Sequence, residues 1–275
     1  MSYKSILVHL KPHHDNAPAI DAAVRIAKTH DAIVAGLYTL REIAMLKLVV
    51  GADHRAVHEA EERLVPPMEK TEASFRAACE VAGVRCSWDV AEGNSNEVLC
   101  LAGRCHDLII VQQTAGGLDN LGTDIAEECA VASGVPTLVV PRRGIHGPIG
   151  QRIVIAWNHS RQAASAVQGA MPFIERAEKV IVLMGEKRDP APSVTRTPQH
   201  DIGAYLRLHN AEVEIATFDS DGAEAGVKLL AAAHGARGDM LVMGAYGRSA
   251  WREFLLGGAT RHVITHLDLP VLMGH

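Results

Sequence analysis

The chain carries the same strand-and-helix pattern twice, and this repeat limits its fold more than any other feature. The apolar run at residues 5–11 (SILVHLK) matches the run at 152–158 (RIVIAWN), so Ile6 pairs with Ile153 at an offset of 153 − 6 = 147 residues. Both runs are rich in β-branched residues, which is typical of a strand buried on both faces. An Ala-rich stretch with helical character follows each run. We therefore expect one βα fold in two copies.

The alternation of strands and helices continues through both halves. Such alternation predicts a doubly wound parallel sheet in each half, and so the α/β class. In the first half, strands are expected at 5–11, 32–40, 84–90, 106–111 and 136–140, with helices at 17–30, 55–82 and 95–105. In the second half, strands are expected at 152–158, 179–185, 212–218, 238–243 and 270–274, with helices at 161–177, 198–210 and 224–236.

A short segment at 142–151 (RRGIHGPIGQ), with three glycines and a proline, reads as the linker between two domains. The domains are then expected at 1–143 and 150–275. They differ after the fourth strand, where only the second half has a G-x-x-G opening. The first half is degenerate there, and its acidic residues are Asp119, Asp124, Glu127 and Glu128.

The second half has glycines at both ends of the segment that follows its fourth strand. Gly244 and Gly247 come directly after the strand, and Gly257 and Gly258 precede an expected helix start. Ligands of open α/β sheets bind at the carboxyl ends of the strands, and glycine lets the backbone come close to them. Free N–H groups and the dipole at a helix start favour an anion such as phosphate. The spacing G-x2-G-x9-G therefore predicts a phosphate cradle.

This segment (GAYGRSAWREFLLGGAT) resembles the nucleotide motif of universal stress proteins, G-x2-G-x9-G-[ST]. The resemblance covers the whole chain and is to the tandem type, with two such domains in one chain. It implies a Rossmann-like, adenine-nucleotide alpha-hydrolase-like fold with a five-stranded parallel sheet in each domain. It also implies ATP or AMP as the ligand, with or without Mg²⁺, as in some members of the family. Many members have no established catalysis.

The chain departs from the family pattern at two places. Gly258 stands where the family has Ser or Thr, and the hydroxyl of Thr260 is a partial replacement. Nucleotide-binding members usually have Asp after the first strand, where this chain has Asn158 in the second half and Lys11 in the first. Asn can still hydrogen-bond an adenine or ribose edge, whereas Lys cannot accept a hydrogen bond. The candidate nucleotide-binding residues are Asn158, Gly244, Gly247, Arg248, Gly257, Gly258, Ala259 and Thr260.

Composition argues against several other classes of function. The net charge is −5 with a pI near 6.3 and no basic stripe, so nucleic-acid binding is not expected. No apolar run approaches the roughly 18–20 residues of a membrane span. The first residues read directly into a strand, and we expect a cytoplasmic protein. P-loop, G-x-G-x-x-G and G-x-S-x-G fingerprints are absent from the sequence.

Histidine, cysteine and tryptophan offer weaker signals. The pairs His54/His58 and His262/His266 would each share a helix face, but neither has a third ligand nearby, so no metal site is expected. Five cysteines in no CxxC spacing indicate free thiols, with Cys100/Cys105 as the alternative redox pair. The segment at 9–15 (HLKPHHD) is read as a polar turn, with anion binding as its alternative. Trp157 either stacks on a base or packs in the core.

These observations favour an adenine-nucleotide-binding stress-response or regulatory protein, with the nucleotide in the second domain. The resemblance also implies that the two final strands pair, so that one chain imitates a dimer of single domains; association of two chains is left open. One alternative is an interaction module that binds no nucleotide, in which the glycines only make turns. Another is a slow ATPase, which would need Glu253 or a histidine to activate water. An enzymatic role is not favoured, and no catalytic residue is assigned.

Overall fold

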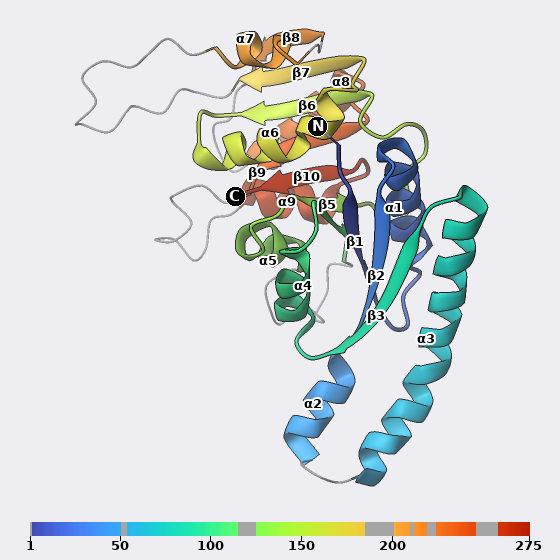
Figure 1. The fold of residues 1–275 in the computed structure, drawn as a ribbon. Helices are drawn as coiled ribbons and strands as arrows, with labels where there is room; N and C mark the ends of the chain where they lie inside the picture. The colour runs from blue at the N-terminus through green and yellow to red at the C-terminus, as the bar shows by residue number, and fades with distance from the viewer. Residues whose placement is uncertain are drawn as a thin grey trace. The chain divides into compact units, whose positions relative to one another are not determined.

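The computed structural model describes residues 2–50, 54–114, 125–184, 201–209, 212–218, 224–245 and 258–275. The chain divides into two compact units, Ser2–Ile145 and His146–His275. Each unit is a parallel sheet with helices on its faces (Figure 1). This confirms the α/β class with doubly wound parallel sheets.

The N-terminal unit has five strands in the order β3-β2-β1-β4-β5, and the neighbouring strands are parallel. The strand β1 is central and almost fully buried, as its run of apolar residues predicts. The strands are β1 Ser5–Leu10, β2 Ile33–Leu40, β3 Cys86–Glu92, β4 Leu108–Gln112 and β5 Thr137–Val140. The helices are α1 Ala17–His30, α2 Arg41–Val50, α3 His54–Ala82, α4 Ser95–Gly103 and α5 Ile125–Ala132.

The C-terminal unit repeats this order as β8-β7-β6-β9-β10, again with parallel neighbours. Its strands are β6 Arg152–Trp157, β7 Lys179–Met184, β8 Val213–Thr217, β9 Met240–Gly244 and β10 Val271–Gly274. Its helices are α6 Arg161–Ile174, α7 Ile202–Arg207, α8 Ala225–Gly235 and α9 Gly258–His266. Since parallel crossovers are right-handed, α6 and α7 lie on one face of this sheet, and α8 and α9 lie on the other.

All ten predicted strands form, and the main differences are two shorter helices and one helix that was not predicted. The helix expected at 161–177 ends at Ile174. In the region expected at 198–210 the structure describes a helix at Ile202–Arg207, and residues 198–200 and 210 lie outside the described part of the chain. The helix α2 was not predicted, because β2 runs directly into it without a turn or capping signal. With α3, which is 29 residues long, α2 forms a helical hairpin that extends away from the strands of its unit (Figure 1).

An aspartate just before the fourth strand of each unit holds the start of the first strand. Asp239 accepts hydrogen bonds from the backbone N–H groups of residues 150, 151 and 152 at 2.9–3.0 Å. Asp107 accepts from those of residues 4 and 5 at 2.7 and 3.0 Å. Charged acceptors make the stronger backbone hydrogen bonds, so both copies use one device to align their central strands.

Two glycines let α6 lie close to the strand ends in the C-terminal unit. A Cβ atom on Gly244 would come within 2.7 Å of the backbone of Gln162 and Ala163, and a Cβ atom on Gly274 within 2.6 Å of the backbone nitrogen of Ala166. Neither glycine has a positive φ. The sequence analysis expects glycine at 244 to let the backbone approach a ligand, and in the structure the close approach there is made by α6.

His9 is a buried histidine in the central strand of the N-terminal unit. Its side chain hydrogen-bonds the hydroxyl of Thr39 at 2.9 Å, and that hydroxyl hydrogen-bonds Ser95 at 2.9 Å. Burial holds the pKa of His9 well below its usual range, and the nearby charges of Lys11 and His14 act in the same direction. His9 is therefore neutral in the folded protein at neutral pH.

We expect Gly244→Ala to lower the free energy of unfolding by about 1–3 kcal/mol, because the added methyl group overlaps the backbone of α6. The matched control is Gly258→Ala, where the Cβ atom meets none of the described residues within 4 Å. The control should change stability by no more than about 0.5 kcal/mol. Urea unfolding of both variants measures the difference. Equal changes in the free energy of unfolding for the two variants would show that α6 can move away from residue 244 without loss of stability.

We also expect acid to destabilise the chain through His9. The unfolded chain binds a proton at this residue below a pH of about 6.5, whereas the folded chain does not. Stability is therefore fully present above that pH and is lost below it, at up to about 1.4 kcal/mol per pH unit. The variant His9→Gln does not titrate there, so its stability should fall less steeply between about pH 6.5 and 5. Parallel pH slopes for the variant and the wild type would contradict a buried neutral His9.

Candidate functional site

The strand order of the C-terminal unit reverses direction between β6 and β9. In open α/β sheets, ligands bind in the crevice outside the carboxyl ends of the strands at such a point. The two strands are in register with Ala156 opposite Met243, so Asn158 and Gly244 lie at neighbouring strand ends. The structure thus brings together two of the predicted site residues.

Asn158 shapes the turn that leads from β6 into α6. Its carboxamide oxygen accepts a hydrogen bond from the backbone N–H of Ser160 at 3.2 Å, and the Ser160 hydroxyl caps α6 by accepting from the N–H of Ala163 at 3.1 Å. Within the described residues, the amide nitrogen of Asn158 has no hydrogen-bond partner. Asn158 therefore presents a donor at the crevice, where an Asp would present only acceptors.

The helix α9 begins at Gly258. Its first residues supply free backbone N–H groups, and the helix dipole places partial positive charge there. Gly258 is exposed and its φ lies outside the left-handed region, so a side chain can be added there. Ala259 is half-buried, and Thr260 is only 7% exposed, so Thr260 presents little surface to a ligand. The other predicted cradle residues, Gly247, Arg248 and Gly257, lie outside the described residues, as does Glu253.

The equivalent end of the N-terminal unit has different chemistry. Lys11 stands there, and the turn after it is closed by Asn16, whose carboxamide bonds both the N–H and the carbonyl of Lys11 at 3.0 and 2.9 Å. Partial burial lowers the pKa of His14, and the positive charges of Lys11 and Arg142 add to the effect. Segment 9–15 thus ends in the polar turn that the sequence favoured, with cationic groups around it.

The acidic residues expected near that end are only partly described. Asp119 and Asp124 lie outside the described residues. Glu127 is buried, and Glu128 accepts a hydrogen bond from the Asn96 side chain at 2.6 Å. The Glu128 carboxylate therefore links α5 to α4.

The cysteines are free thiols, as predicted. Cys100 lies with its sulfur 4.0 Å from that of Cys129, whereas Cys105 is exposed. Burial raises the pKa of the Cys100 thiol and raises that of Cys79 to about 12, which makes both poor nucleophiles at neutral pH.

The two histidine pairs show no metal-site geometry where the structure describes them. His262 and His266 stack on α9 with ring centroids 4.1 Å apart, and His58 pairs with Glu62 at 3.3 Å. No three His, Cys, Asp or Glu side chains converge among the described residues. Likewise, none of the helices in the described part of the chain is long and apolar enough to cross a membrane.

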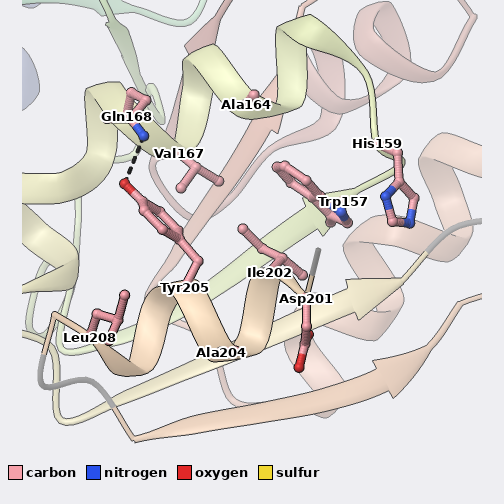
Figure 2. A pocket seen from close by; sticks show the side chains of 10 residues that line it. All are labelled: Trp157, His159, Ala164, Val167, Gln168, Asp201, Ile202, Ala204, Tyr205 and Leu208. Carbon is pink, nitrogen blue, oxygen red and sulfur yellow. Dashed lines mark hydrogen bonds between the residues drawn. The ribbon is translucent and has the colours of Figure 1, made fainter. Parts of the chain in front are cut away.

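The structure also contains a pocket that no sequence motif indicated. It lies between α6 and α7, has a volume of about 600 Å³, and reaches the end of β6 at Trp157 (Figure 2). Tyr205 projects into it from α7, and its hydroxyl accepts a hydrogen bond from the Gln168 side chain at 2.7 Å. Trp157 is half-buried and lines this pocket, so it neither belongs wholly to the core nor stands free in the crevice. In the sequence, only the rarity of aromatic residues, which are 4% of the chain, could have drawn attention to Trp157 and Tyr205.

Comparison with known proteins relates the whole chain to one fold and its C-terminal unit to one family. The model of the universal stress protein family matches residues 150–275, and no curated protein sequence matches the chain. A universal stress protein from Archaeoglobus fulgidus DSM 4304 shares the fold over 98% of this chain and 97% of that chain, at 15% identity and a TM-score of 0.70. A functionally unknown protein from Pseudomonas aeruginosa PAO1 matches 98% of this chain and 92% of its own, at 16% identity and a TM-score of 0.52.

A universal stress protein family protein from Arabidopsis thaliana, solved with AMP bound, matches 50% of this chain and 92% of that chain, at 16% identity and a TM-score of 0.35. The family model covers the C-terminal unit, and the fold of the Archaeoglobus fulgidus protein extends over nearly all of the chain. Residues 150–275, which make up nearly all of the C-terminal unit, match the universal stress protein family.

Proposed function

We propose that the C-terminal unit binds an adenine nucleotide, ATP or AMP, in the crevice between β6 and β9, and that the chain acts as a stress-response or regulatory protein. One observation supports the proposal most strongly. The region that matches the family model, residues 150–275, contains the point where the strand order reverses between β6 and β9. Asn158 and the start of α9 both belong to the matched region. The first offers a side-chain donor, and the second offers backbone donors for phosphate.

The chemistry of this site is binding and orientation. The N–H groups at the start of α9 would hold the phosphate, and the amide of Asn158 would hydrogen-bond the ribose or the base. ATP would bring Mg²⁺ with it, coordinated mainly by phosphate oxygens and water. Under this proposal the N-terminal unit, with Lys11 in place of Asn158, takes no nucleotide at its equivalent end.

A second candidate function is a protein-interaction module that binds no nucleotide. It is favoured by one observation: close packing of α6 explains Gly244 without a ligand. Calorimetry of the full chain with AMP, and with ATP in the presence and absence of Mg²⁺, separates the two functions. One nucleotide bound per chain supports the first, and no heat of binding at millimolar nucleotide supports the second. A phosphate-release assay on the same samples tests the slow ATPase.

We expect Gly258→Ser to tighten AMP binding by about tenfold, because an added hydroxyl at the start of α9 can donate a hydrogen bond to the phosphate. The site has room for the side chain and a backbone that serine adopts without strain. The matched control is Gly258→Ala, which changes the helix start in the same way but adds no donor. Equal dissociation constants for the serine and alanine variants would place the phosphate elsewhere.

A further inference from the structure

We propose that the pocket between α6 and α7 is a second binding site, which takes a neutral planar aromatic molecule that carries a hydrogen-bond acceptor. Its volume of about 600 Å³ lies within the usual range of about 300–1,000 Å³ for small-molecule sites. The proposal does not depend on nucleotide binding by the crevice.

The walls of the pocket fit a flat apolar ligand. Val167 and Ile202 supply aliphatic surface from the two helices, while Trp157 and Tyr205 supply aromatic faces (Figure 2). Leu208, which is 79% exposed, lies at one end of the pocket, and His159 lies at the other. Aromatic rings pack well against such surfaces, since offset and edge-to-face arrangements add to the gain from buried area.

The polar groups of the pocket call for an acceptor on the ligand. The indole Nε1 of Trp157 is buried and out of reach of a ligand, so the pocket's aromatic donor is the hydroxyl of Tyr205. The Tyr205 hydroxyl already accepts from Gln168, which leaves its own proton free to donate. A ligand with a ring nitrogen or a carbonyl would accept a hydrogen bond from this hydroxyl.

The charges around the pocket favour a neutral ligand. The described lining contains no lysine or arginine, so an anion would find no fixed positive charge there. Asp201 accepts a hydrogen bond from the N–H of Gly203 at 2.8 Å, which caps α7. Figure 2 shows its carboxylate directed away from the aromatic side chains, so it offers little to a cation among them.

The N-terminal unit has a pocket in the equivalent place, between α1 and α3, but with different walls. By the repeat offset of 147, its residues Ala17, Ile20 and Asp21 correspond to Ala164, Val167 and Gln168. That pocket has no aromatic ring of Phe, Tyr or Trp in its lining and is bordered by polar side chains: His13, His14, Asp15, Asn16, Lys70, Thr71 and Ser74. The fold therefore makes the space in both copies, and only the C-terminal copy has given it aromatic walls.

The pocket is also distinct from the proposed phosphate site. It lies on the face of the sheet that α6 and α7 cover, whereas α9 lies on the opposite face. A molecule between α6 and α7 therefore leaves the start of α9 open.

The test compares quinoline with naphthalene, two rings of the same shape of which only quinoline has an acceptor nitrogen. Equilibrium dialysis of the full chain at pH 7.5 should show one quinoline per chain, bound about fivefold more tightly than naphthalene, as one neutral hydrogen bond predicts. Tyr205→Phe keeps an aromatic ring and removes the hydroxyl, so it should abolish this preference. Ala164→Phe fills the pocket and should weaken both ligands by at least about tenfold.

The matched control is Ala17→Phe, the same substitution in the equivalent N-terminal pocket, which should leave both affinities unchanged. Equal weakening by Ala164→Phe and Ala17→Phe, no preference for quinoline in the wild type, or no binding at about 1 mM ligand would overturn the proposal. Saturating AMP should leave quinoline binding unchanged. Displacement of quinoline by AMP would show that this pocket is part of the nucleotide site, and would overturn the proposal of a separate site. If AMP does not bind at all, the proposed function fails while the quinoline result stands.

Discussion

The C-terminal unit depends on how closely α6 lies against the ends of β9 and β10. That approach requires hydrogen in place of a side chain at Gly244 and Gly274. It fixes the start of α6, and with it the Ser160 cap and the turn at Asn158. The position of α6 in turn shapes the crevice and the aromatic pocket. The turn between β6 and α6 borders the crevice, and α6 forms a wall of the pocket.

The two units show which parts of a duplicated fold must be kept. The carboxylates of Asp107 and Asp239 hold the central strand in both copies, because the backbone N–H groups that precede a first strand need an acceptor wherever this topology is used. The strand ends and the inter-helix pockets carry no such requirement. There the copies diverge, with Lys11 against Asn158 at the strand end. Both copies thus keep the aspartate that holds the central strand, whereas the residues at the strand ends differ. This pattern is expected where one copy has specialised in a function.

Hydrophobic periodicity was enough to find every strand, because parallel strands buried on both faces are continuous apolar runs. It missed α2, because β2 runs directly into this helix without a turn. It predicted a longer helix than the described α7, which has only six residues. At the candidate site, motif spacing pointed to Gly244 and Gly258, and the position after β6 pointed to Asn158. Their role in nucleotide binding stays a prediction, and the packing of α6 by itself accounts for a glycine at 244. The pocket could not be found in this way, since Trp157 and Tyr205 come from distant segments whose contact is a property of tertiary structure alone.

The helix α3 contains two successive prolines, Pro66 and Pro67, near its middle. Proline has no backbone N–H, so two consecutive rungs of the helical hydrogen-bond ladder are missing at that level. On one side of the prolines α3 buries Phe75 and Cys79, and on the other side it buries Ala60 and Leu64. The hydrogen-bond ladder of α3 is therefore weakest at this level, and local opening of the helix is expected to begin there.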